Sequence, residues 1–117
     1  MAHHTTIEQS KHLLELGLPP ETADMNWHEL PNIGTFVRIF PYAQPNGATE
    51  GFLPCWSLGS LLELMPNGSH IEKINSIYSC YTVYNKPFKD STPVGAAYNA
   101  ICWLLEHYKY EGERNTI

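Results

Sequence analysis

Residues 91–108 read STPVGAAYNAICWLLEHY, and this stretch carries the clearest structural signal in the chain. Ser91 or Thr92 is a suitable helix cap, and Pro93 suits the first helical position because its missing N–H needs no partner there. Apolar side chains then recur at the spacing of one helical face: Val94, Ala97, Tyr98, Ile101, Leu105 and Tyr108. The stretch therefore predicts a helix that begins at Pro93 and continues through Tyr108.

The same helix has a second apolar face. On a helical wheel Trp103 lies opposite the first stripe, and Ala96, Ala100 and His107 flank it. A helix that is apolar on nearly all sides is buried on more than one side, which indicates a central helix or a subunit interface. As an interface, the two alanines would let a partner helix approach around Trp103 in a homo-oligomer. The alternative is a core position for Trp103.

Two more helices are expected from their caps. Thr5 or Thr6, followed three residues later by Glu or Gln, forms a capping box for an amphipathic helix over about Ile7–Leu16. Ser57 is the expected N-cap of a helix over Leu58–Met65, which has an apolar stripe of leucines.

Strands are expected in three places. Thr35–Phe40 is β-branched and aromatic, and we expect two further strands over Ile71–Asn75 and Ile77–Tyr84. Pro19–Asp24 predicts a turn or a single helical turn, and Tyr42–Pro54 predicts a long loop. The fold class is therefore α+β: a small, mostly antiparallel sheet of three to four strands packed with about three helices.

Composition supports a single compact domain over residues 1–117, with residues 1–5 and 111–117 frayed. Aromatic residues make up 12% of the 117 residues, which argues against disorder. Twelve acidic residues against seven basic ones give a net charge of -5, which argues against binding to nucleic acid through phosphates. No apolar run approaches the ~20 residues of a membrane span.

The compartment is inferred from the N-terminus and from the cysteines. The first residues contain no apolar signal segment, and Cys55, Cys80 and Cys102 match no metal or redox spacing. We therefore expect reduced thiols in the cytoplasm, and we expect neither a metal nor a cofactor.

A ligand site is the leading functional hypothesis. The region from Leu30 to Leu62 has only two charged side chains, Arg38 and Glu50. Several aromatic residues lie within this region or just beside it. Small-molecule pockets combine apolar and aromatic walls with a few polar groups, and an arginine among rings can clamp a phosphate or carboxylate. The expected ligand-binding residues are Trp27, Arg38, Tyr42, Phe52 and Trp56, with Tyr84 (or Tyr81) and Lys86 from the later strand. The alternative is that these aromatic residues close the core.

Catalysis and metal binding have weaker support in the sequence. Asp24 and His28 are four residues apart and would form a carboxylate–imidazole pair on a helical turn, although a surface loop is the plainer interpretation. Each cysteine lacks the sequence context of a nucleophile. His3, His4 and His12 lack the spacing of metal ligands. We therefore assign no catalytic residue and regard an enzyme as the third hypothesis.

Several segments resemble small proteins of phages and mobile elements of gut bacteria, a group with no assigned activity. The resemblance is carried by TIEQSKHLLELGLP (Thr6–Pro19), Trp27, CWSLGSLLELMP (Cys55–Pro66), Ala97–Tyr98 and CWLLE (Cys102–Glu106). It implies an accessory protein in the cytoplasm of a bacterial host cell.

Together these features indicate a non-enzymatic binding protein. In the setting that the resemblance implies, it would sequester a nucleotide-like signal of host defence, an anti-defence role. The alternative is a protein-interaction module that inhibits a host protein.

Overall fold

The computed structural model describes residues 3–30, 34–39, 52–83 and 86–108. Within these ranges the chain forms three α-helices, one short 3-10 helix and six strands. In chain order they are α1 (Ile7–Glu15), η1 (Pro20–Thr22), β1 (Met25–Leu30), β2 (Gly34–Ile39), β3 (Phe52–Cys55), α2 (Leu58–Glu63), β4 (His70–Ile74), β5 (Ile77–Tyr81), β6 (Pro87–Asp90) and α3 (Pro93–Tyr108). The strands are antiparallel, so the expected α+β class is confirmed.

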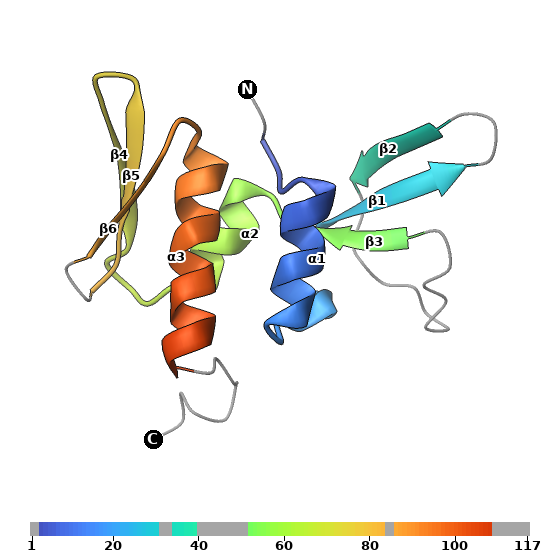
Figure 1. Ribbon diagram of the computed structural model, residues 1–117, viewed down its shortest axis with the longest axis horizontal. Helices are drawn as coiled ribbons and strands as arrows, with labels where there is room; N and C mark the ends of the chain where they lie inside the picture. The colour runs from blue at the N-terminus through green and yellow to red at the C-terminus, as the bar shows by residue number, and fades with distance from the viewer. Residues whose placement is uncertain (1–2, 31–33, 40–51, 84–85, 109–117) are drawn as a thin grey trace.

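The strands belong to two three-stranded sheets, where the sequence indicated one sheet. The first sheet has the order β2-β1-β3 and the second has the order β4-β5-β6. Figure 1 shows the helices between the two sheets, with α3 beside β4–β6 and α1 beside β3. The first sheet therefore extends away from the helices on the side opposite to the second sheet.

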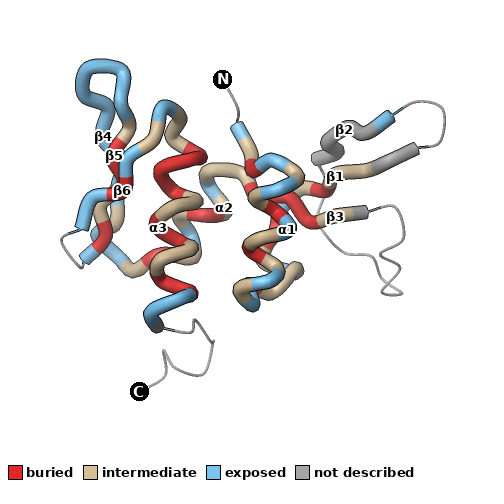
Figure 2. Tube along the Cα trace, viewed as in Figure 1, coloured by how far each residue is buried: buried red, intermediate tan, exposed pale blue. Residues whose placement is uncertain are grey.

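Helix α3 is the centre of the hydrophobic core. The second sheet packs against it from one side and α2 packs against it from another. Its buried residues therefore occupy more than one face of the helix, as Figure 2 shows: Val94, Gly95, Ala96, Ala97, Ala100, Ile101, Leu104 and Leu105. This arrangement explains the second apolar face without a second subunit.

The first helix begins and ends close to the predicted residues. The Thr6 hydroxyl accepts a hydrogen bond from the Gln9 N–H (3.0 Å), and the Gln9 side-chain oxygen accepts one from the Thr6 N–H (2.9 Å). This reciprocal pair is the predicted capping box. Leu16 is the C-cap, and Gly17 follows in the left-handed region with φ 99°.

The N-terminal residues just before α1 are held against the residues that follow β3. The Thr5 N–H donates to the Trp56 carbonyl oxygen (2.9 Å), and the Trp56 N–H donates to the Thr5 hydroxyl (3.1 Å). His4 and Ser57 form an isolated β-bridge beside this pair. The expectation of a frayed N-terminus is therefore wrong at His4 and Thr5, because a distant segment pairs with them. The expectation for residues 111–117 lies outside the described residues.

The first sheet contains one expected strand and two that the sequence did not indicate. The strand expected over Thr35–Phe40 is β2. Strand β1 lies in a segment for which no element was predicted, and β3 lies in the region expected to be a loop. Strand β3 contains Pro54, which has no N–H for a ladder and therefore suits an edge strand such as this one.

The second sheet contains the two predicted strands, which pair as a hairpin, and it adds the edge strand β6. Strands β4 and β5 meet at Asn75 and Ser76, whose φ angles of 53° and 68° suit a two-residue turn of type I′. Strand β5 ends at Tyr81, three residues earlier than expected. Strand β6 was missed because proline and charged residues occupy three of its four positions.

Candidate functional site

The expected ligand-binding residues are distributed over both sheets. Trp27 lies in β1, Arg38 lies in β2, and Phe52 begins β3. These three strands are neighbours, so the fold brings three of the expected positions into one sheet. Lys86 lies one residue before β6, beside the other sheet, and is exposed. Tyr42 and Tyr84 lie outside the described residues.

Trp27 holds the N-terminal segment against the first sheet. Its indole N–H donates to the Thr5 carbonyl oxygen (3.2 Å). The His4 ring meets the indole edge-on, with the ring centres 5.3 Å apart and the planes at 85°. Trp27 is half-buried by these contacts. They give its indole a structural role in this fold.

Trp56 is a core residue. Its side chain is completely buried, and its indole N–H donates to the Thr22 hydroxyl (2.9 Å). A ligand can stack only on a ring face that solvent reaches, so Trp56 does not line a ligand site in this structure. Its position agrees with the alternative interpretation, in which this aromatic residue closes the core.

The register of the first sheet determines which positions share a face. Asn26 pairs with Arg38 on β2 and with Pro54 on β3, which makes one row across the sheet. The next row contains Trp27. Successive rows of a pleated sheet lie on opposite faces, so the register separates the positions of Trp27 and Arg38. The sequence grouped these two positions only because both flank the charge-poor region.

Asn26 shares a row of the sheet with Arg38 and was not among the expected ligand-binding residues. Its side chain is 0% exposed, and neither its amide nitrogen nor its amide oxygen has a hydrogen-bond partner among the described residues. Buried side-chain amides nearly always have such partners. An asparagine inside a strand is unusual, because asparagine is depleted in strands. The sequence could not draw attention to Asn26 in this way, because β1 was not predicted as a strand.

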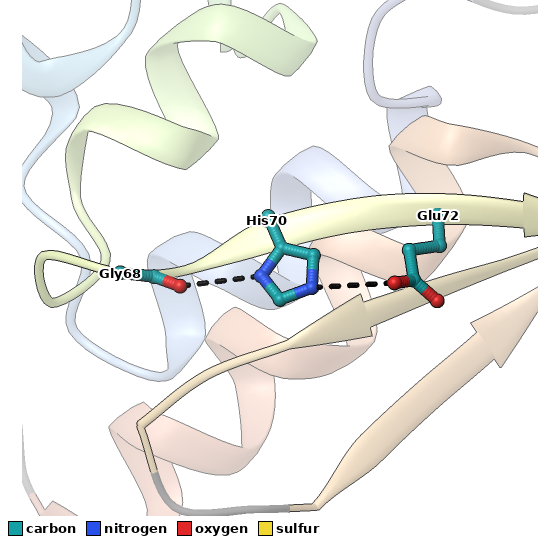
Figure 3. Close-up of polar contacts among 3 residues, drawn as sticks. All are labelled: Gly68, His70 and Glu72. Carbon is teal, nitrogen blue, oxygen red and sulfur yellow. Dashed lines mark hydrogen bonds and ion pairs between the residues drawn. The ribbon is translucent and has the colours of Figure 1, made fainter.

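A cluster of polar contacts around His70 lies on the exposed face of β4 (Figure 3). His70 Nδ1 lies 3.2 Å from the Gly68 carbonyl oxygen, and His70 Nε2 lies 3.8 Å from a Glu72 carboxylate oxygen. The His70 ring stacks on the Tyr81 ring, with the centres 5.2 Å apart. Both ring nitrogens and one face of the imidazole therefore contact groups within residues 68–81. Within the described ranges, no group of three His, Cys, Asp or Glu residues is arranged to hold a metal ion.

The apolar hollow beside α3 has no polar lining. It is formed by aliphatic side chains alone: Leu18, Leu64, Ile101, Leu104 and Leu105. A ligand pocket needs a few polar groups to orient its occupant, and this hollow provides none. It is therefore a packing defect at the edge of the core.

The residues considered for catalysis have structural roles in the described contacts. The Asp24 carboxylate accepts hydrogen bonds from the Ser57 N–H and hydroxyl, so it supports the cap of α2. Burial raises the pKa of the Cys55, Cys80 and Cys102 thiols to about 11. Thiols with such a pKa stay protonated at neutral pH and are poor nucleophiles.

The residues considered for a subunit interface divide into two groups. Ala96 and Ala100 are completely buried within the chain, so a partner helix cannot reach them in this structure. Trp103 is half-buried, 5.8 Å from the Phe88 ring, and it stacks on the exposed His107 ring at 4.5 Å. The predicted contact through the alanines therefore requires correction, because β6 and α2 already cover α3. Association through Trp103 and His107 stays a prediction.

Comparisons with protein-family models, with curated proteins and with solved structures find no match to this chain. Among the described residues, no helix is long and apolar enough to cross a membrane.

Proposed function

We propose that this chain is a non-enzymatic binding protein for a small ligand, with its site on the first sheet and with Arg38 as the charged contact. One observation carries the proposal: the register sets Arg38 directly opposite Asn26, whose buried amide has no hydrogen-bond partner within the described part of the chain. An arginine offers a planar, always charged fork of donors that matches a phosphate or carboxylate. The neighbouring amide adds neutral hydrogen-bonding capacity on the same face.

The proposed ligand is nucleotide-like, because such a ligand has an anionic part and a neutral, planar part. A small ligand suits the charge of the protein better than a nucleic acid does. The net charge is -5, and a polyanion would be repelled over its whole length. A single phosphate group needs only one local cation.

The biological setting is part of the proposal and rests on the resemblance of the segments around Thr6–Pro19 and Cys55–Pro66 to proteins of phages and mobile elements. In that setting the protein would act in the cytoplasm of a bacterial host. It would sequester a signalling nucleotide of host defence stoichiometrically.

A calorimetric titration with a panel of nucleotides tests the proposal. We expect saturable binding by the unchanged protein, and we expect Arg38→Ala to weaken it by tenfold or more. Lys89→Ala is the matched control, since it removes an exposed cation of the second sheet, and it should leave the affinity unchanged. Absence of saturable binding, or equal binding by the Arg38→Ala variant, would refute the proposal.

A second candidate function is a protein-interaction module that inhibits a host protein. It is favoured by the tip of the β4–β5 hairpin, where the cross-strand partners Ile74 and Ile77 are 57% and 41% exposed. Neighbouring exposed aliphatic residues are typical of contact surfaces. This candidate predicts that a host protein is retained on the immobilised chain, and that the double variant Ile74→Ser, Ile77→Ser does not retain it. It also predicts that nucleotides do not shift the melting temperature.

A further inference from the structure

The side-chain amide of Asn26 has no structural role among the described contacts of the fold. Asn26 lies in β1, the central strand of the first sheet, and its side chain is completely buried. Among the residues that the structure describes, neither polar atom of its amide has a hydrogen-bond partner. Such a group costs stability, because folding removes it from water and provides nothing in exchange.

Two neighbours of Asn26 within the described part of the chain offer no hydrogen bond to its amide. Pro54, opposite it on β3, has neither an N–H nor a polar side-chain atom. Asp24, two residues before it in the chain, binds the N–H and the hydroxyl of Ser57. A leucine at position 26 would have the same branched shape with two larger methyl groups, a better strand propensity and no amide to desolvate. An asparagine here is therefore unfavourable for both local structure and packing.

We propose that the Asn26 amide recognises the base of the ligand by two hydrogen bonds. This inference rests on the proposed function, in which Arg38 contacts the phosphate. A primary amide offers one acceptor and two donors in a plane, and an asparagine commonly makes a two-point contact with the amino group and the neighbouring ring nitrogen of adenine. The ligand class is therefore a nucleotide whose base has an amino group beside a ring-nitrogen acceptor.

Burial of the amide has a consequence for binding. Because the side chain is 0% exposed, a base reaches it only after the covering part of the protein moves aside. Association should then be slower than the ~10⁵–10⁷ M⁻¹s⁻¹ typical of preformed surfaces. Once the base is in place, the hydrogen bonds form in surroundings without competing water, where they are strongest.

The first test uses the unchanged protein and two probes. Adenosine and purine riboside differ only in the amino group of the base, and neither has a phosphate. We expect adenosine to bind at least tenfold more tightly, because only adenosine makes both contacts with the amide. Equal affinities would overturn the inference, even if nucleotides bind through Arg38.

The second test separates recognition from folding. Asn26→Leu should raise the melting temperature by roughly 4 °C, because it removes the unsatisfied amide, and it should abolish the preference for adenosine. Asn99→Leu is the control, since Asn99 is part-exposed and its amide donates to the Lys89 carbonyl oxygen (3.3 Å). Asn99→Leu should leave the preference unchanged.

The outcomes distinguish this inference from the proposed function. If Asn26→Leu lowers the melting temperature or fails to fold, the amide has a structural role and the inference is overturned. If Asn26→Leu keeps the preference for adenosine while Arg38→Ala loses nucleotide binding, the inference fails and the proposed function stands. If the unchanged protein binds neither nucleosides nor nucleotides, both fail.

Discussion

The Asp24 carboxylate accepts hydrogen bonds from both the backbone N–H and the hydroxyl of Ser57. Ser57 is the N-cap of α2, and its hydroxyl oxygen accepts in turn from the Ser60 N–H (3.1 Å). The residue before β1 therefore supports the start of a helix that lies 33 residues later in the chain. This relay connects the first sheet to the helical core.

Asp24→Ala should lower the free energy of unfolding by about 1 kcal/mol, the usual effect of a lost helix cap. Chemical denaturation measures the change. Glu21→Ala is the control, because Glu21 is an exposed residue of η1, and its effect should stay within about 0.5 kcal/mol. If the two variants are equally stable, the Asp24–Ser57 contact does not support α2.

Gly95 should tolerate no side chain. A Cβ atom at this position would overlap the Asp90 carboxylate, and it would lie 2.9 Å from the Thr92 hydroxyl oxygen. Gly95→Ala should therefore destabilise the protein by at least ~1 kcal/mol, although alanine is the better helix former.

Gly59→Ala provides the matched control for Gly95. Gly59 also lies in a helix, but there the nearest atom to an added Cβ is the Ser57 hydroxyl oxygen at 3.8 Å. Alanine should raise the free energy of unfolding by about 0.5–1 kcal/mol at this position. Opposite signs in thermal unfolding of the two variants support the packing argument, whereas two stabilising changes contradict it.

The turn between β4 and β5 offers a stabilising substitution. Ser76 has a φ of 68°, a region that side chains disfavour and glycine tolerates. Ser76→Gly produces the Asn-Gly pair preferred in type I′ turns and should stabilise the protein by ~0.5–1 kcal/mol in chemical denaturation. Ser76→Ala keeps the strained conformation and should give no gain. If alanine stabilises as much as glycine, the positive φ is not the cause.

Thr5 should be sensitive to loss of its hydroxyl group. The hydroxyl accepts from the Trp56 N–H and lies 2.8 Å from the Ser10 hydroxyl, and both Thr5 and Ser10 are completely buried. Thr5→Val keeps the shape but leaves these partners unsatisfied, so the free energy of unfolding should fall by about 1–3 kcal/mol. Ser91→Ala, at an exposed position, should have little effect. Equal unfolding midpoints for the two variants would contradict this role.

Stability should decrease at alkaline pH because of the cysteines. Burial raises the pKa of Cys55, Cys80 and Cys102 from 9.0 to about 11. Between these values the unfolded thiols lose protons that the folded thiols keep. The free energy of unfolding should therefore fall as pH rises from about 9 to about 11.

The contribution of one thiol can be isolated with Cys102→Ala. This variant should show a shallower decrease of the free energy of unfolding over the same pH interval, measured by denaturant titration at each pH. Cys102 suits the test because it is only half-buried, so the alanine leaves a smaller packing defect than it would at Cys55. Identical slopes for the variant and the unchanged protein would show that this thiol titrates alike in both states.

The sequence alone determined the three helices and the residue at which each begins. The capping box at Thr6 and Gln9, the cap at Ser57 and the period of α3 all predicted elements that the structure contains. These signals are local, because a helix satisfies its backbone within four residues and its caps lie one turn away. The hairpin that the two predicted strands β4 and β5 form is local for the same reason.

The tertiary structure decided the pairing of the first sheet and the placement of the site residues. Strand β3 has only four residues, one of which is Pro54, so nothing local distinguishes it from a loop. It becomes a strand because β1, 24 or more residues earlier, supplies its ladder. The pairing of β1 with β2 sets Asn26 opposite Arg38 and places Trp27 in the neighbouring row of the sheet. The ladder is formed with a distant segment, so its register and the faces that it creates depend on the whole fold.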